Sequence, residues 1–294
     1  MRVHWRLRDS STLIAGAAVA IYLLGTAAMV FAQSPAPEAA RVLSIGGSVT
    51  EIVIALGQND RLIGRDTTST YPPEIEALPD VGYMRALSPE GVLSVVPDLI
   101  VSEDGAGPPE AIDVLQAAGI PMVTIPDGYD RAGLRAKIEA VGDALGVPDK
   151  AAALADKTLA RLDTAVEGIN GDPKRVLFIL STQGGRILAS GTGTAADGII
   201  RLSGATNAVA AFEGYKQMTD EAVTAADPDV ILMMDRGGDH GAVDAELFAM
   251  PSLSTTQAAT SGAIVRMDGL LLLGFGPRTP DAVEALAAAL AEAG

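Results

Sequence analysis

The sequence predicts an α/β fold of two similar lobes, each a parallel sheet flanked by helices, joined by one long connecting helix. Three observations support this class. From residue 41 onward, short apolar strand segments alternate with helical segments, a pattern typical of parallel sheets covered by helices on both faces. Features of the first half recur in the same order in the second half. A long helical segment rich in Ala, Lys, Arg and Glu separates the two halves.

The first half contains the strand and helix segments of one complete lobe. Residues 41–45 and 62–64 are strand candidates, and so are residues 99–101 and 122–125. Between the first two strands, a Gly46-Gly47 turn leads into a helix ending near Gly57, with Ser48 as its expected N-cap. The G-x-G-x-x-G spacing of dinucleotide-binding turns is missing here. Ser88-Pro89-Glu90 opens a short helix with a serine cap and an acid in the first turn. Residues 109–118 form the next helix.

The segment of residues 134–169 is mainly helical and is interrupted at residues 146–148 by Gly-Val-Pro. We therefore expect an N-terminal lobe at 41–147, a connecting helix at 148–170 and a C-terminal lobe at 171–294. A helix over residues 149–169 is about 30 Å long. Two lobes joined by one stiff helix leave a cleft between them with limited hinge freedom.

The second half repeats two signals of the first. Residues 175–179 (RVLFI) resemble residues 41–45 (RVLSI), and Pro228 follows Glu221 at the spacing at which Pro97 follows Glu90. Ligands of open α/β sheets bind beyond the carboxyl ends of the strands. Two facing lobes bring two such edges together, so the cleft between the lobes is the expected ligand site.

The N-terminal 32 residues have the features of a secretory signal peptide. Three arginines precede an apolar run at residues 13–31, and cleavage is expected after Ala32, with a proline-containing linker at 33–40. The run is also long enough for an uncleaved membrane anchor, which is the alternative. With the leader removed, His240 is the only histidine and no tryptophan remains, since Trp5 lies in the leader.

Composition excludes several classes of protein. The chain has 294 residues, no cysteine and a formal net charge of -16. Such acidity disfavours binding to nucleic acid or to an anionic membrane surface. The absence of cysteine rules out a disulfide scaffold and a lipidated N-terminal cysteine. We therefore expect a protein that is free in the periplasm. We also expect it to be a monomer in solution.

The polar stretch at residues 67–74 holds the main candidate for a ligand-binding side chain. Tyr71 precedes Pro72 and Pro73, which fix their own φ and push the preceding residue into extended backbone. A tyrosine on such a stiff, non-helical segment suits a side chain that points at a ligand, and a tyrosine oxygen can bind haem iron. The alternative is a tyrosine that packs against its own loop.

The chain resembles the substrate-binding proteins of ABC importers, in the helix-backbone class that carries cobalamin, ferric siderophores and haem. Within that class it is most similar to the periplasmic haemin-binding proteins. The resemblance covers the chain from about residue 41 and depends on residues 44–51 (SIGGSVTE), 71–74 (YPPE), 82–91 (GYMRALSPEG), 184–185 (GG), 189–191 (ASG) and 274–278 (GFGPR). The second and third of these blocks favour haem over the other ligands.

The resemblance implies a haem carrier without catalytic activity. Tyr71 would bind the ferric iron, and Arg85 and Arg278 would hold the haem propionates through charge-assisted hydrogen bonds. Glu90 and Glu221, one in each lobe, would dock onto arginines of a permease dimer that works with ATPase subunits. The alternatives are that the two arginines form only ion pairs, and that the two glutamates serve only the helix dipole.

Weaker candidates for the cleft complete the expected site: Tyr83, Gln183, Tyr215, Met234 and Arg236. Met233 and Met234 are neighbours on a strand, so they face opposite sides and at most one can reach the iron; core packing is the alternative for both. Some relatives use a histidine of the second lobe as a second iron ligand. His240 does not match that position and is expected on a solvated loop, so the second ligand stays open.

Other ligands and functions are alternatives to haem transport. A carrier of ferric siderophore or cobalamin is the nearest alternative. One histidine and no cysteine cannot build a usual zinc site. An exported enzyme is disfavoured, because the sequence has no G-x-S-x-G elbow and almost no residues for cysteine- or histidine-dependent chemistry. A receptor subunit that signals after binding its ligand remains a further alternative.

Overall fold

The computed structural model describes residues 41–235 and 241–293. The predicted signal peptide (1–32), the linker (33–40), Arg236 and His240 lie outside the described residues. The other expected site residues all fall within them.

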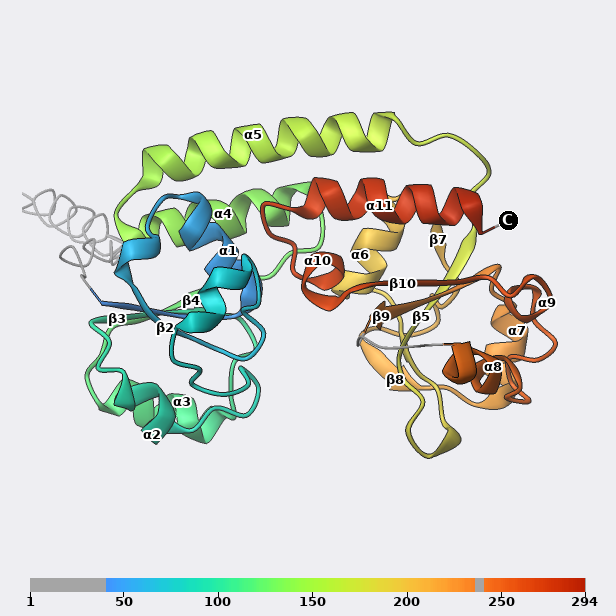
Figure 1. Ribbon diagram of the computed structural model, residues 1–294, viewed down its shortest axis with the longest axis horizontal. Helices are drawn as coiled ribbons and strands as arrows, with labels where there is room; N and C mark the ends of the chain where they lie inside the picture. Colours follow the sequence, from blue (N-terminus) through green and yellow to red (C-terminus); the bar gives the residue numbers. More distant parts are fainter. Residues whose placement is uncertain (1–40, 236–240, 294) are drawn as a thin grey trace, which may run out of the picture. The chain divides into compact units, whose positions relative to one another are not determined.

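The first lobe, where Figure 1 labels β2, β3 and β4, is built on a parallel sheet in the order β2-β1-β3-β4. Its strands are β1 (Val42–Ile45), β2 (Leu62–Arg65), β3 (Leu99–Glu103) and β4 (Met122–Ile125). Its helices are α1 (Gly47–Ala55), α2 (Pro89–Ser94), α3 (Pro109–Ala117) and α4 (Arg131–Leu145), with 3-10 turns at η1 (Asn59–Arg61) and η2 (Pro73–Ala77). The strand and helix order therefore agrees with the sequence prediction.

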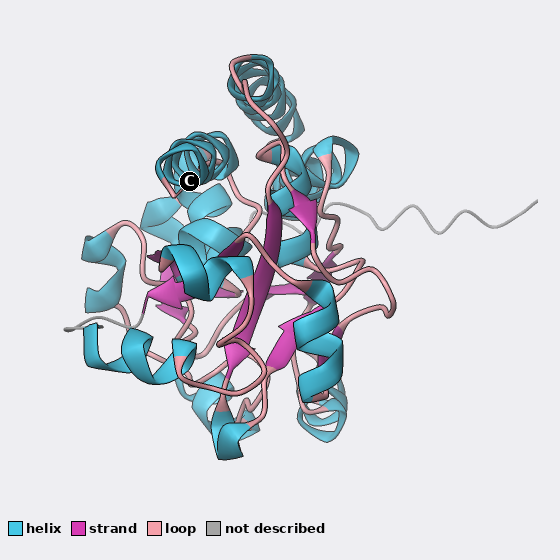
Figure 2. Cartoon of the chain, turned by 90° about the vertical axis from the view of Figure 1, so that its right-hand side faces the viewer, coloured by secondary structure: helices cyan, strands magenta, loops and turns pink. Residues whose placement is uncertain are grey.

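Both faces of the first sheet are buried, as the short apolar strands predict. Leu99 and Val101 of β3 belong to one core cluster, and Ile100 between them belongs to another. This alternation places successive side chains on opposite faces of the sheet, each of which is covered by helices. Figure 2, a view from the side of the second lobe, shows strands of the molecule with helices on either side.

The second lobe contains a sheet in the order β10-β9-β5-β6-β8, with β7 paired to β5. The strands are β5 (Arg175–Ser181), β6 (Leu188–Ser190), β7 (Thr206–Asn207), β8 (Tyr215–Gln217), β9 (Val230–Asp235) and β10 (Ile264–Asp268). The helical elements are η3 (Gln183–Gly185), α6 (Ala195–Leu202), α7 (Asp220–Ala226), α8 (Gly241–Phe248), α9 (Gln257–Ser261), α10 (Gly269–Leu273) and α11 (Thr279–Glu292).

One detail of the second sheet differs from the expectation of two parallel sheets. Strands β7, β9 and β10 continue the parallel pattern, whereas β6 runs antiparallel to β5, and β8 antiparallel to β6. The reason lies in the tight turn after β5, where Gly184 and Gly185 both have positive φ. Such a turn reverses the chain and produces a hairpin, which is antiparallel by construction.

The connecting helix α5 (Pro148–Glu167) leads from the first lobe to the second (Figure 1). Pro148 occupies its first turn, where the missing N–H costs nothing. Its buried face, which includes Ala151, Leu159 and Leu162, packs against α4 of the first lobe and α11 of the second. The lobe boundaries at 147 and 171 stay a prediction. Among the described helices, α5 included, none is both long and apolar enough to cross a membrane.

The start of α1 corrects the prediction that Ser48 caps this helix. The N-cap is Gly46, and Ser48 lies buried inside the first turn. Gly46 has a φ of 105°, a conformation that favours glycine. Two N–H groups at the start of the helix are instead satisfied by a neighbouring loop: Gly46 donates to Asp66 Oδ1 and Gly47 donates to Thr68 Oγ1.

Candidate functional site

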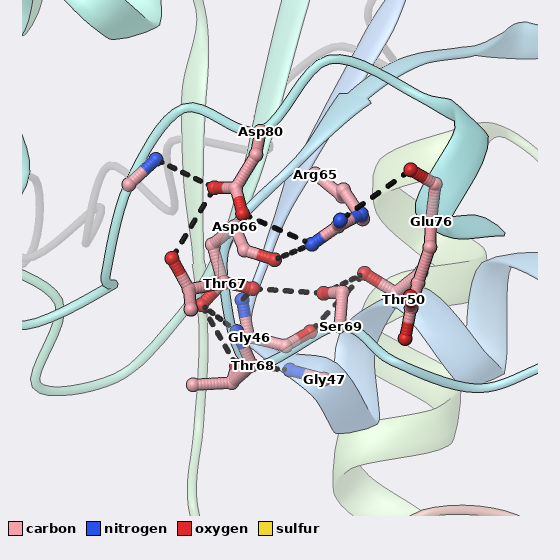
Figure 3. Close-up of polar contacts among 11 residues, drawn as sticks. Gly46, Gly47, Thr50, Arg65, Asp66, Thr67, Thr68, Ser69, Glu76 and Asp80 are labelled. Atoms are coloured by element: carbon pink, nitrogen blue, oxygen red, sulfur yellow. Dashed lines mark hydrogen bonds and ion pairs between the residues drawn. The ribbon is translucent and has the colours of Figure 1, made fainter. Parts of the chain in front are cut away.

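The loop that carries Tyr71 is held by one buried carboxylate. Asp66 follows β2 directly and is completely buried. Its Oδ1 accepts hydrogen bonds from Gly46 N (3.0 Å) and Ser69 Oγ (2.8 Å), and its Oδ2 accepts from Thr68 N (3.0 Å) and Thr68 Oγ1 (2.8 Å) (Figure 3). The carboxylate thus joins the loop to the start of α1. Tyr71, shortly after Ser69, is therefore held on an anchored segment.

A second carboxylate joins this loop to the block that contains Tyr83. Asp80 Oδ1 accepts from Thr67 Oγ1 (3.2 Å) and from Gly82 N (2.8 Å), and its Oδ2 pairs with Arg65 at 3.2 Å (Figure 3). The chain around Tyr83 is thereby tied to the start of the Tyr71 loop. The two sequence blocks that favour haem lie on loops that share one hydrogen-bond network.

The ring of Tyr71 contacts the guanidinium of Arg278, which belongs to the second lobe. The tyrosine side chain is 42% exposed, and the guanidinium of Arg278, the N-cap of α11, lies 3.6 Å from the centre of its ring. Arg278 also donates from Nε to Glu51 Oε2 at 3.0 Å and from Nη2 to Glu51 Oε1. Because Glu51 lies on α1, these contacts join the two lobes. We call the contact region of α1, the Tyr71 loop and the 274–278 segment the lobe junction.

Glu51 and Arg278 form an ion pair in which the carboxylate is buried and the guanidinium is partly buried. The Glu51 side chain is only 6% exposed, and burial raises the pKa of its carboxyl against the opposing hydrogen bond and charge of Arg278. Burial lowers the pKa of Arg278, but the hydrogen bond and charge of Glu51 and the neighbouring Tyr71 outweigh it, so the net shift is upward. The two-bond, fork-like geometry is the strong form of an arginine–carboxylate pair.

Arg85 and Tyr215 are candidates from different lobes. Arg85 is exposed in the first lobe, and its Nη1 lies 3.4 Å from where a Cβ on Gly105 would be. Tyr215, on β8 of the second lobe, stacks edge-to-face on Phe178 with ring centres 6.3 Å apart. Burial raises the pKa of Tyr215, while a hydrogen bond with Thr194 and the charge of Arg85 work in the other direction.

The remaining described candidates differ in how they are placed. Tyr83 is 47% exposed, and Gln183 is exposed in the turn between β5 and β6. Met234 is half-buried against the core cluster that also contains Leu232, and Met233 packs against a different cluster. The two methionines thus face opposite sides of β9, as expected for neighbours on a strand. No group of three or more His, Cys, Asp or Glu side chains suited to a metal ion occurs among the described residues.

A family model for periplasmic binding proteins matches residues 42–270. This chain belongs to the periplasmic binding protein family. The match covers both sheets, so the two-lobe arrangement described above is the fold of the family.

Solved structures and curated relatives of this periplasmic binding protein support the same grouping. The periplasmic heme-binding protein BhuT, solved with two hemes, is 43% identical with a TM-score of 0.80, covering 86% of this chain and 98% of that one. The apo periplasmic heme-binding protein RhuT from Roseiflexus sp. RS-1 is 36% identical with the same TM-score and coverage. Of the curated relatives, the uncharacterized ABC transporter substrate-binding lipoprotein YvrC of Bacillus subtilis is 31% identical, covering 85% of this chain and 79% of its own length. The vitamin B12-binding protein of Yersinia pestis is 27% identical, with 74% and 77% covered.

Glu90 and Glu221 occupy equivalent positions in the two lobes of this periplasmic binding protein. Each lies exposed in the first turn of a short helix, two residues after the N-cap. The cap hydroxyls, of Ser88 and Thr219, accept from the N–H of Gly91 and Ala222 respectively. The pKa of Glu221 is lowered by its own backbone N–H and by Thr219. The N-cap hydroxyl and the glutamate therefore recur together, once in each lobe, as the internal duplication predicts.

Three structural residues of the site did not emerge from the sequence. Asp66 and Asp80 anchor the loops, and Glu51 pairs with Arg278 across the lobes. Asp66 had a recognisable signal, since Asp followed by Thr-Thr-Ser is typical of a side chain that caps nearby backbone N–H groups. Glu51 had none, because its partner is 227 positions away in the sequence.

Proposed function

We propose that this protein captures haem at the lobe junction and delivers it to an inner-membrane ABC importer, with Tyr71 as the iron ligand. The placement of Tyr71 carries the proposal: an exposed phenol on an anchored loop, next to an arginine from the other lobe. The similarity to heme-binding proteins over 86% of the chain supports haem as the ligand. The role is transport without catalysis, as in the substrate-binding family to which the chain belongs.

The residues around Tyr71 fit a ferric ligand. A phenolate is a hard anionic oxygen donor and favours Fe(III), which suits a carrier that does not reduce its cargo. When the phenolate binds iron, the guanidinium at 3.6 Å from the ring offsets part of its negative charge. The network of Asp66 keeps the loop in place while the ligand enters.

Arg85 and Arg278 are proposed as contacts of the haem propionates. Arg278 already has a carboxylate partner in Glu51, so a propionate must share its guanidinium, whereas Arg85 is exposed. Iron protoporphyrin dimethyl ester, which lacks the free carboxylates, separates this role from others. We expect Arg85→Gln to weaken haem binding about tenfold and to leave binding of the ester unchanged. Equal losses for both ligands would contradict a propionate contact.

Titration of the Soret band with haemin tests the iron ligand. Native protein should give a tyrosinate-type ferric spectrum. Tyr71→Phe removes only the hydroxyl and should lose this spectrum, with binding at least about 100-fold weaker. Tyr83→Phe, at a tyrosine of similar exposure in the same loop network, is the matched control and should retain the native spectrum. Unchanged spectrum and affinity in Tyr71→Phe would remove the iron-ligand role.

A carrier of cobalamin or ferric siderophore is the second candidate, and the vitamin B12-binding relative favours it. Competition between haemin, cyanocobalamin and a ferric siderophore at equal concentrations distinguishes the candidates. We expect haemin to displace both others. Tighter binding of cobalamin would instead support a cobalamin carrier.

The proposed location is the periplasm, with the leader cleaved after Ala32. One curated relative is named a lipoprotein, whereas this sequence has no cysteine for a lipid anchor. Its partners there are the permease dimer, contacted through Glu90 and Glu221, and the ATPase subunits behind it. The carrier itself is proposed to be a monomer. N-terminal sequencing of the exported protein and its elution volume on size exclusion test these points.

A further inference from the structure

A completely buried lysine lies inside the first lobe. The Lys137 side chain, on α4, has no exposed surface. Its Nζ lies 2.7 Å from Asp127 Oδ1 and donates to Glu103 Oε1 (3.0 Å), to the carbonyl of Gly274 (3.2 Å) and to Ser48 Oγ (3.3 Å). Lysine is almost never fully buried unless its charge is paired. Here two carboxylates pair it, and neutral oxygens take up the remaining hydrogen-bonding capacity of the ammonium.

One of these partners belongs to the second lobe. Gly274 ends α10 and begins the 274–278 segment, which ends at Arg278. Between the two, Phe275 packs edge-to-face on Tyr129 of the first lobe, with ring centres 5.4 Å apart at 68°. Lys137 therefore holds the beginning of the segment, and Glu51 holds its end.

We propose that Lys137 is a positioning residue for the candidate site. By binding the Gly274 carbonyl it fixes the 274–278 segment, and through that segment it sets the guanidinium of Arg278 over Tyr71. The effect on haem rests on the proposed function, but the effect on Tyr71 in the ligand-free protein does not.

Protonation of Glu103 modulates this contact. Burial raises the pKa of Glu103 to about 7, with the charge of Lys137 opposing the shift. The titratable groups that face it are Lys137 on α4 and Asp127 after β4; beyond them, Tyr129 donates to Asp127. When Glu103 is protonated, the ammonium faces one charged carboxylate. When Glu103 ionises, a second negative charge competes with the neutral Gly274 carbonyl for the ammonium protons, so the hold on the segment weakens.

Fluorine NMR of the ligand-free full chain, labelled with 3-fluorotyrosine, tests the positioning role. The Tyr71→Phe variant assigns the Tyr71 signal, and Arg278→Gln defines its position once the guanidinium is lost. We expect Lys137→Met to shift the Tyr71 signal in the same direction as Arg278→Gln. Arg135→Met is the matched control: it removes a cation from the same helix whose carboxylate partners, Glu139 and Asp156, lie at the surface. A folded Lys137→Met protein with the native Tyr71 signal would overturn the proposal.

A second measurement does not depend on the stability of Lys137→Met. In native protein the Tyr71 signal should move with pH, with a midpoint near the Glu103 pKa of about 7. Glu103→Gln, which keeps the shape and removes the titration, should abolish that midpoint. A native signal that shows no such midpoint, or a midpoint that survives in Glu103→Gln, contradicts the inference.

Haem binding supplies the functional arm of the test. We expect Lys137→Met to weaken haem affinity about tenfold, the size of effect seen when a residue supports a ligand from outside the coordination shell. Because the NMR arms contain no haem, failure of the native protein to bind haem would overturn the proposed function alone. Native haem affinity in Lys137→Met, together with an unmoved Tyr71 signal, would overturn the positioning role alone.

Discussion

At the scale of single residues, the candidate site depends on buried carboxylates whose hydrogen bonds go to protein donors. Asp66 accepts four hydrogen bonds while completely buried, and Glu51 holds Arg278 by two. Both carboxylates accept hydrogen bonds from backbone or side-chain donors, which would otherwise be buried without partners. Tyr71 is exposed and Arg278 is partly buried, and the positions of both follow from the buried groups behind them.

Asp66→Asn is the residue-scale test of loop anchoring. Asparagine replaces one acceptor oxygen by an NH₂ group that faces donors, so we expect a loss of about 2 kcal/mol in the free energy of unfolding. Urea denaturation followed by circular dichroism measures it. Asp80→Asn, in the same network but with a side chain 39% exposed, should cost less than about 1 kcal/mol. Equal losses would show that the burial of Asp66 gives it no special role.

At the scale of elements, the start of α1 is where the loop network and the helix meet. Gly46 combines a positive φ with close contact to Glu103: an added Cβ would lie 2.6 Å from the Glu103 Cβ. A glycine is therefore required at position 46 for two reasons: the backbone has a positive φ, and Glu103 leaves no room for a Cβ. The turn after β1 also delivers the N–H groups of Gly46 and Gly47 to the Asp66 loop.

Gly46→Ala and Gly57→Ala separate these two requirements. Both glycines have positive φ, but nothing lies within 4 Å of a Cβ added at Gly57. We expect Gly57→Ala to cost about 1 kcal/mol, the penalty for a left-handed alanine. Gly46→Ala should cost about 3 kcal/mol, because the clash with Glu103 adds to the strain of an alanine at φ 105° and ψ 125°, outside the left-handed helical region. Thermal unfolding measures both, and similar melting temperatures would mean that the Glu103 contact relaxes without cost.

At the scale of the whole molecule, the sequence predicts the order of elements and misses the contacts between lobes. Alternating strands and helices, the break at Pro148 and the cap at Ser88 are local signals, and each has its counterpart in the structure. The antiparallel pairing of β6 and β8 departs from the predicted parallel sheet, because the Gly184-Gly185 turn reverses the chain after β5. Lys137 and Gly274 lie 137 positions apart, and no local pattern connects them. Their pairing exists only once both lobes have folded.

The buried Glu103 gives the whole fold a pH dependence. Its pKa is raised by burial from 4.5 to about 7, so the folded chain binds more protons than the unfolded chain between these values. The stabilisation is complete below about pH 4.5 and is lost as the pH rises through about 7. We expect the difference in unfolding free energy between native protein and Glu103→Gln to change across this window by a few kcal/mol at most, on the order of 3. Urea denaturation at a series of pH values measures it, and a pH-independent difference would contradict the raised pKa.

Delivery to the permease is the prediction that needs both lobes at once. Glu90 and Glu221 occupy equivalent exposed positions, so a docking role predicts that each lobe supplies one contact. We expect Glu90→Gln and Glu221→Gln to leave haem affinity unchanged and to reduce haem uptake about tenfold each, with a larger loss in the double variant. Cells that depend on this importer for haem provide the assay. Asp220→Asn removes another acid from the first turn of α7 and controls for the helix dipole. If Asp220→Asn reduces uptake as much as Glu221→Gln, Asp220 and Glu221 serve only the helix dipole. Normal uptake in the Glu90/Glu221 double variant would exclude docking through these two glutamates.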